Sequence, residues 1–144
     1  MSVSALHSLL AVLGLALVGC ALQVTSKDLI GDWRMTDEAV QRLGVKAPRP
    51  RFKLNGDGSL IAENVPSSAF QDSSPWRAGY TGPGTWTTPA TRRTEGFASL
   101  VLDFKQTGPN RPTGLTLQVD KDSGGLYVFT WLDEEGGERL IYRR

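Results

Sequence analysis

Hydrophobic and polar residues alternate along most of the chain after residue 50, and a two-residue period is typical of β-strands with one buried face. In FASLVLDFK (97–105), the side chains of Leu100, Leu102 and Phe104 share one face. The run Asn55-Gly56-Asp57-Gly58 separates two such segments and is a strong signal for a hairpin turn. The pattern predicts strands over these ranges: 31–35, 51–55, 59–65, 84–88, 97–105, 115–119, 126–132 and 138–144.

This spacing of short strands and turns predicts a mainly β protein, a small antiparallel barrel or sandwich of about seven or eight strands. The segment TDEAVQRLG (36–44) is expected to form about two turns of helix, so at most one short helix is predicted. LYVFTWL (126–132) is apolar on both faces, which predicts a central strand. Residues 29–144 are long enough to bury a core as a single domain.

An apolar run precedes the β region and ends at Cys20, the one cysteine of the chain. Residues 9–19 are all apolar or glycine. The run is shorter than the roughly 20 residues of a membrane span, but it has the length of the apolar part of a signal peptide. Its end, LVGC (17–20), resembles the lipobox of bacterial lipoprotein precursors. The alternative is an uncleaved N-terminal helix that contains an incidental cysteine.

The lipobox resemblance implies a particular processing and location. Residues 1–19 would be a signal peptide, Cys20 would carry the lipid, and residues 20–28 would form the lipidated cysteine and its tether. The resemblance therefore implies a lipoprotein of the cell envelope, held by its N-terminal lipid on the extracytoplasmic face of the cell membrane or the outer membrane. Two acyl chains provide stable anchoring.

Charge and composition exclude several classes of function. The chain has 16 basic and 15 acidic residues, and this balance argues against nucleic-acid binding, which usually requires a basic patch. The single histidine, His7, lies in the signal segment. The mature chain therefore lacks the residues for Ser-His-Asp or Cys-His catalysis and for His- or Cys-ligated zinc or copper. We expect no catalytic residue, metal or cofactor; a carboxylate-dependent hydrolase is the least favoured alternative.

Two acidic runs contain carboxylates of the kind that bind cations. Asp120-x-Asp122 precedes two glycines, but the twelfth position of an EF-hand loop starting at Asp120 would be Trp131 rather than glutamate. Asp133, Glu134, Glu135 and Glu138 surround a second glycine pair. Both runs are interpreted as solvated polar turns.

The segment from Pro66 to Pro83 is the strongest candidate for binding. Loops of this length are uncommon in compact domains and are often functional. The segment contains residue types that are enriched at binding hot spots. These candidates are Phe70, Trp76, Arg77 and Tyr80. The alternative is that the aromatic side chains fold back and plug one end of the barrel.

Gly31-x-Trp33 on the first expected strand, with Arg143 and Arg144 ending the last, is similar to the arrangement in calycins and lipocalins. The resemblance implies that the tryptophan packs under an arginine and closes one end of the barrel, through a cation–π contact and apolar burial. The alternative is a simple core tryptophan. A second G-x-W occurs at Trp86. Trp33, Trp86 and Arg143 are therefore expected to be structural.

A second resemblance covers nearly the whole mature chain. The order LIGDW, FKLNGDGSLIAENVP, GPGTWT and LYVFTWLDEEGGERLIYRR looks like a group of small exported bacterial proteins, many from actinobacteria. The resemblance implies fold and export, but no activity. We therefore expect a non-catalytic envelope binding module for a small apolar ligand, a glycan or another envelope protein. The alternative is a structural or enzyme-inhibitor lipoprotein that acts through protein–protein contact.

Overall fold

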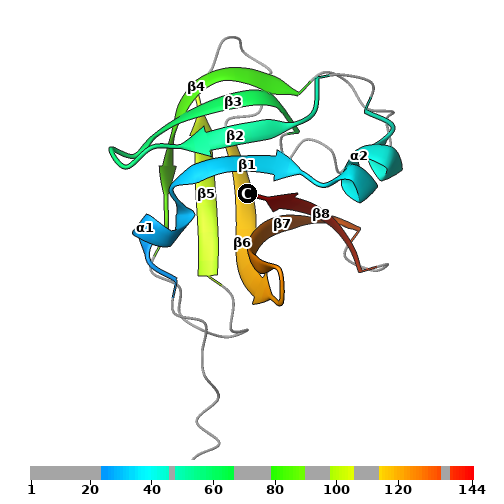
Figure 1. The fold of residues 1–144 in the computed structure, drawn as a ribbon. Helices are drawn as coiled ribbons and strands as arrows, with labels where there is room; N and C mark the ends of the chain where they lie inside the picture. Colours follow the sequence, from blue (N-terminus) through cyan, green and yellow to red (C-terminus); the bar gives the residue numbers. More distant parts are fainter. Residues whose placement is uncertain (1–23, 46–47, 67–78, 90–97, 106–113, 134–136) are drawn as a thin grey trace, which may run out of the picture.

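The computed structural model describes residues 24–45, 48–66, 79–89, 98–105, 114–133 and 137–144. In these residues eight antiparallel strands form one closed barrel, each strand pairing with its neighbours in sequence and β8 with β1 (Figure 1). The strands are β1 Gly31–Met35, β2 Arg51–Leu54, β3 Ser59–Val65, β4 Tyr80–Thr87, β5 Ala98–Phe104, β6 Gly114–Asp122, β7 Gly125–Asp133 and β8 Glu138–Arg143. The expected mainly β, antiparallel architecture is confirmed, as a barrel and not a sandwich.

Two short helices accompany the described strands, where at most one was expected. α2, Asp37–Leu43, is the expected one, and it ends at Gly44, whose left-handed φ of 65° lets its N–H reach the carbonyls of the last turn. α1, Ser26–Leu29, is a single turn. It forms because the Asp28 carboxylate accepts hydrogen bonds from the Thr25 N–H at 2.7 Å and the Thr25 hydroxyl at 2.8 Å.

β4 begins at Tyr80, four residues before the strand expected at 84–88. The Tyr80 ring stacks on Phe104 of β5, with 4.4 Å between ring centroids, and its hydroxyl donates to the Pro83 carbonyl at 2.5 Å. These contacts hold a glycine- and proline-rich stretch in the sheet. Part of the segment interpreted as a loop is therefore strand.

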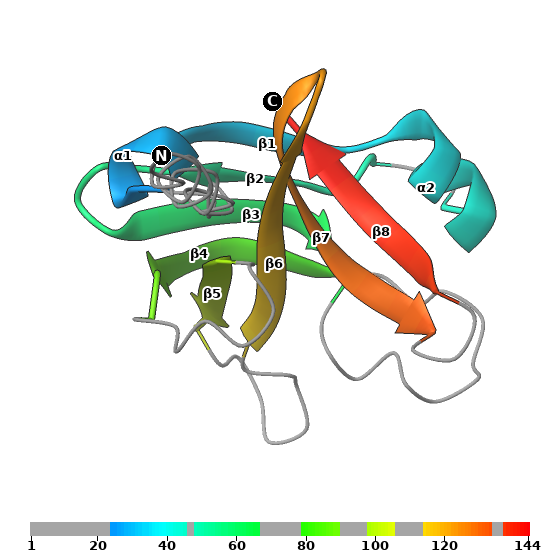
Figure 2. The ribbon, with the colours of Figure 1, turned by 90° about the horizontal axis from the view of Figure 1, so that it is seen from below.

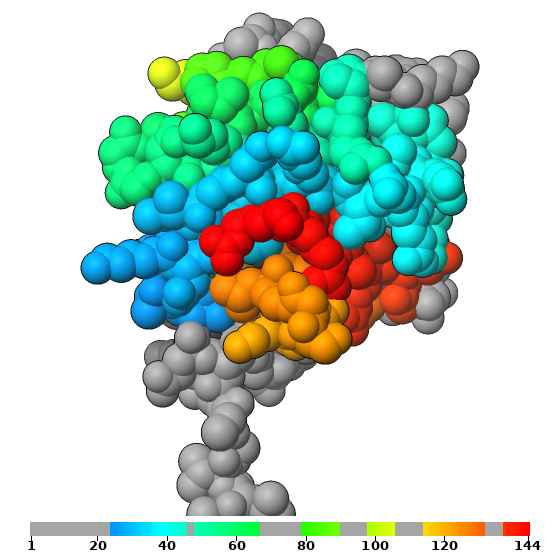
Figure 3. Space-filling view, viewed as in Figure 1, coloured from blue at the N-terminus to red at the C-terminus, as the bar shows by residue number. Residues whose placement is uncertain are grey.

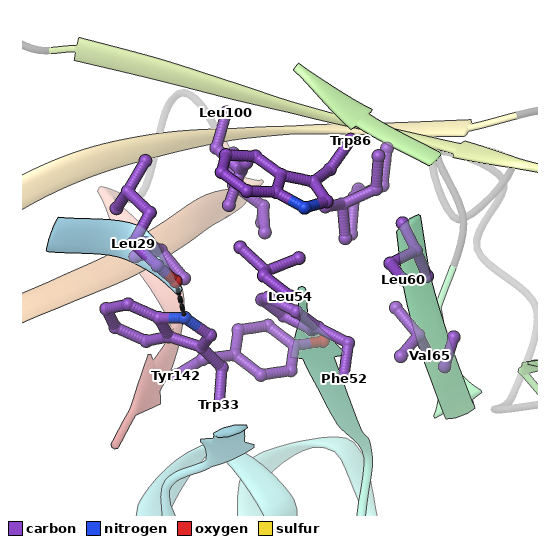
Figure 4. Packing of buried hydrophobic residues seen from close by; sticks show 14 of the residues in the cluster. Leu29, Trp33, Phe52, Leu54, Leu60, Val65, Trp86, Leu100 and Tyr142 are labelled. Carbon is purple, nitrogen blue, oxygen red and sulfur yellow. Dashed lines mark hydrogen bonds between the residues drawn. The ribbon is translucent and has the colours of Figure 1, made fainter. Parts of the chain in front are cut away.

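The barrel interior is one apolar cluster built from the inward-facing residues of all eight strands. Leu100 and Leu102 have no exposed surface and Phe104 is 5% exposed, which confirms the buried face expected for this strand. Phe52 and Tyr142 meet at 5.2 Å between ring centroids, and Figure 4 shows them near Trp33, on the opposite side of the cluster from Trp86. Each large apolar side chain contributes roughly 1.5–3 kcal/mol through burial.

Trp33 ties α1 and the C-terminus to one end of the barrel. Its indole N–H donates to the Leu29 carbonyl at 2.8 Å, and the side chain is fully buried. The Arg144 guanidinium lies 5.2 Å from the centre of the Trp33 ring and donates to the Ile30 carbonyl at 3.3 Å. At Gly31, where φ is 146°, a Cβ would come within 3.1 Å of the Arg144 side chain. The glycine of this G-x-W therefore leaves room for the arginine.

Trp86, in the second G-x-W, also anchors a chain segment to the barrel, but at a different position. Its indole N–H donates to the Asn55 carbonyl at 2.9 Å, so it fastens the turn between β2 and β3 to β4. A Cβ at Gly84 would clash with the Asp103 carbonyl of β5. Both tryptophans are buried and both are structural, but they secure different parts of the barrel.

Candidate functional site

Three aromatic side chains project from the outer side of β7, away from the barrel interior. Tyr127, Phe129 and Trp131 alternate with inward-facing residues such as Val128, which belongs to the core cluster. The ring centroids of Tyr127 and Phe129 are 5.8 Å apart. Those of Phe129 and Trp131 are 5.5 Å apart, with the rings edge to face at 89°. We call these three residues the outer aromatic row.

Arginines of β8 lie over the outer aromatic row. Strand pairing sets Arg139 opposite Trp131, and the Arg139 guanidinium carbon lies 4.5 Å from the centres of both the Phe129 and Trp131 rings. The guanidinium of Arg143 lies 4.9 Å from the Tyr127 ring. Arginine stems cover apolar surface while the charged heads stay in water. β7 is thus covered on both faces, as expected for a central strand, but its outer cover includes charged side chains.

Aspartates of β6 complete this face. The Tyr127 hydroxyl donates to Asp120 at 3.0 Å. The pKa of Tyr127 is raised, mainly by burial and to a smaller extent by this hydrogen bond. Arg143 donates to both carboxylate oxygens of Asp122, at 2.5 and 3.2 Å. The pKa of Asp122 is lowered, mainly by the hydrogen bond from Arg143 and to a smaller extent by the one from the Gly124 N–H. Asp122 thus orients Arg143.

Arg143 therefore faces away from Trp33. The arginine that covers Trp33 in the way implied by the calycin resemblance is Arg144. Adjacent residues of a strand point to opposite sides, so only one of the two arginines can lie over the first-strand tryptophan. Arg143 instead joins β6 and β7 through Asp122 and Tyr127.

A groove of about 200 Å³ lies next to Arg139, between α2 and β8. Figure 2 shows α2 alongside β8, and in Figure 3 the cyan residues of α2 adjoin the red C-terminal strand. The groove is lined by Thr36, Glu38, Ala39, Arg42, Gly137, Arg139 and Ile141. It has an apolar part, from Ala39 and Ile141, between charged walls. The outer aromatic row, its arginines and this groove form one continuous candidate site because Arg139 belongs to both.

The binding candidates from the sequence fall in different places. Cys20, Phe70, Trp76 and Arg77 lie outside the described residues. Tyr80 is half-buried on β4, packed against Phe104. Tyr80 is therefore part of the sheet and packs against the neighbouring strand β5.

Asn64, near the end of β3, forms side-chain hydrogen bonds with the segment before β2 and with the residue before β4. Its side-chain N–H donates to the Pro48 carbonyl at 2.6 Å, and its side-chain oxygen accepts the Gly79 N–H at 2.8 Å. The residue is 5% exposed and has a φ of 51°, a conformation that asparagine tolerates better than most residues. Asn64 therefore positions the start of β4.

Sequence reasoning did not single out the outer aromatic row or Arg139. The signal was present: Tyr127-x-Phe129-x-Trp131 and Arg139-x-Ile141-x-Arg143 flank one turn, so pairing across it brings rings and guanidinium groups together. The apolar character of β7 on both faces drew attention to its central place in the sheet. The nature of its outer cover depends on the pairing register, which the sequence leaves open.

Comparisons with family models, curated proteins and solved structures gave no match for this chain. Neither of the described helices has the length and apolar character needed to cross a membrane. Among the described residues, no three His, Cys, Asp or Glu side chains are grouped closely enough to hold a metal ion.

Proposed function

We propose that this protein is a lipid-anchored, non-catalytic module of the bacterial cell envelope that binds another envelope protein. The contact surface is the outer face of β7 and β8. The observation that carries the proposal is the outer aromatic row with Arg139 and Arg143 over it. Tryptophan, tyrosine and arginine are the residues most enriched at the energetic centres of protein interfaces.

The barrel interior also favours protein binding over the transport of a small apolar ligand. Side chains from all eight strands meet there, and the largest are fully buried. A barrel filled by its own residues serves as a scaffold, whereas a carrier of apolar molecules needs an enclosed cavity. An outer contact surface also suits the alternative of an inhibitor or structural lipoprotein, because that role uses protein–protein contact as well.

The anchor is tested separately from the partner. The Cys20→Ser chain is expected to lose metabolic fatty-acid labelling and to leave the membrane fraction. A serine variant that stays membrane-bound like the wild type would contradict the lipid anchor, whatever the outcome for partner binding.

The partner is tested by site-specific photo-crosslinking in intact cells. A photoreactive phenylalanine replaces Thr116, exposed on the outer side of β6 next to β7, or Lys53, exposed on the outer side of β2. Adducts are expected from position 116 and not from position 53. Adding Trp131→Ala to the first variant should remove the adduct while circular dichroism shows an intact fold. Equal labelling from both positions, or labelling that survives Trp131→Ala, would contradict this contact surface.

A further inference from the structure

Arg139 differs from the other arginines on the described surface in its partners. Seven arginines lie in the described residues, and five of them pair with a carboxylate. These pairs are Arg34 with Asp32, Arg42 with Glu38, Arg49 with Asp37, Arg51 with Glu63, and Arg143 with Asp122. Arg144 uses the Ile30 carbonyl and the Trp33 ring. Arg139 has no carboxylate partner among the described residues.

The position of Arg139 is nevertheless well defined. Its guanidinium lies 4.5 Å from two ring centres, and one of its N–H groups reaches the Tyr127 hydroxyl at 3.5 Å. Stacking uses the faces of the guanidinium and leaves the N–H groups at its edge for an acceptor. A side chain that is already held in place loses little conformational entropy when it binds.

The groove beside Arg139 has room and charge for one small anionic group. Its volume of about 200 Å³ is of side-chain size. Arg42 on its wall is neutralised by Glu38 at 2.7 Å, so Arg139 supplies the remaining positive charge. One negative charge on a bound group would therefore balance the positive charge of Arg139.

We infer that this groove binds the carboxylate of an aspartate or glutamate side chain on the protein partner, with Arg139 as its specific contact. The planar guanidinium matches a carboxylate with two parallel hydrogen bonds. Ala39 and Ile141 contact the aliphatic part of the incoming side chain, and the outer aromatic row supports the arginine from beneath. This inference rests on the proposed function, since it names the chemistry of the partner at the same face.

The test uses the full chain in a neutral detergent and two small probes. N-acetyl-glutamate N-methylamide carries the carboxylate, and the matching glutamine compound is its neutral isostere. The Nε–Hε signal of Arg139 and the amide signal of Gly137, a groove residue, are followed by NMR at pH 7. We expect a saturable shift with the glutamate probe, with a dissociation constant of about 1–10 mM, and no shift with the glutamine probe.

Two variants assign the effect to Arg139. Arg139→Lys keeps the charge without the planar fork and should weaken binding at least tenfold, as read at Gly137. Arg51→Gln removes an arginine on β2 that already has a carboxylate partner, and it should leave binding unchanged. The wild-type comparison of the two probes is interpretable by itself if the Arg139 variant does not fold.

Three results would overturn the carboxylate assignment: equal shifts with both probes, no shift with either, or stronger Arg139-dependent binding to phosphatidylglycerol vesicles than to the glutamate probe. The last would identify a lipid headgroup as the ligand. Crosslinks from position 116 that persist while the probe fails to bind would remove only this inference. Probe binding without any crosslink would remove the proposed function and leave the carboxylate site standing.

Discussion

The inner faces of β7 and β8 are buried, whereas their outer faces are partly exposed, and different side chains cover the two. On the inside, Val128 and Tyr142 are covered by side chains of the other strands, and both have no exposed surface. On the outside, Phe129 also has no exposed surface, yet the residues over it include the guanidinium of Arg139. One cover belongs to the closed core and the other includes charged side chains.

The difference shows why apolar residues alone do not identify a core. The closed barrel provides a low-dielectric interior that suits uncharged side chains. The outer aromatic row is shielded by arginines whose charged edges remain available to water or a partner. An apolar layer beneath a cationic edge is the composition expected at the centre of a protein interface. The following changes test how different the two faces are.

The largest effect is expected at Trp33. Trp33→Ala removes a fully buried indole, its hydrogen bond to Leu29 and its contact with Arg144, and should cost about 5 kcal/mol of unfolding free energy. Lys121→Ala, at an exposed position near the end of β6, should change stability by less than about 0.5 kcal/mol. Urea unfolding measures both. Equal effects would contradict the structural role of Trp33.

The second-largest effect is expected at Phe129 and tests whether the outer aromatic row is shielded from water. Phe129→Ala should cost about 3 kcal/mol because the ring is fully buried although it lies outside the barrel core. The matched control is Ile61→Ala, on the outer side of β3, where the side chain is 54% exposed; its loss should stay below about 0.5 kcal/mol. If both substitutions cost equally little, the arginine layer does not shield the outer aromatic row in solution.

Tyr142 and Tyr80 provide a pair with opposite expected signs. Tyr142→Phe removes a buried hydroxyl that lacks a hydrogen bond to any described group, and should stabilise the protein by about 1 kcal/mol. Tyr80→Phe removes a hydroxyl bonded to the Pro83 carbonyl and should destabilise by about the same amount. Thermal unfolding at pH 7 distinguishes them. Destabilisation by Tyr142→Phe would indicate that a buried water or ligand satisfies this hydroxyl.

The burial of Tyr142 also predicts that folding stability depends on pH in the alkaline range. Burial raises the pKa of Tyr142 far above the ordinary tyrosine value of about 10. Above about pH 10 the tyrosine hydroxyl loses its proton in the unfolded chain but keeps it in the folded chain. Folding stability therefore falls as pH rises. Tyr142→Phe should lose less stability than the wild type between about pH 9 and 11. Identical slopes would mean that the hydroxyl is accessible in the folded state.

The smallest effect is expected for the exposed pair of Asp122 and Arg143. The Arg143 hydrogen bond lowers the pKa of Asp122, so the stabilisation is present above the unfolded value of about 3.9 and is lost as pH falls through the folded value. Asp122→Asn should lower the melting temperature slightly at pH 7. The difference should disappear at about pH 2 and shrink in high salt. A difference that persists under both conditions would point to a packing role.

The strand pattern by itself determined most of the barrel. The predicted ranges 31–35 and 59–65 agree with β1 and β3 residue for residue, because alternation and the Asn-Gly-Asp-Gly turn are local properties. The helix expected over 36–44 is present as α2, and the glycine that ends it is likewise a local signal. Lipidation at Cys20 remains a sequence prediction.

Only the tertiary structure decided which residues form the candidate site. Arg144 rather than Arg143 covers Trp33, and Arg139 meets the outer aromatic row, because strand register fixes which side chains share a face. β4 extends through Gly82 and Pro83, usual turn residues, because β3 pairs with them. The contact between Arg144 and Ile30 spans 114 positions of the chain. Local composition carries no information about such a contact, since barrel closure alone brings the two ends together.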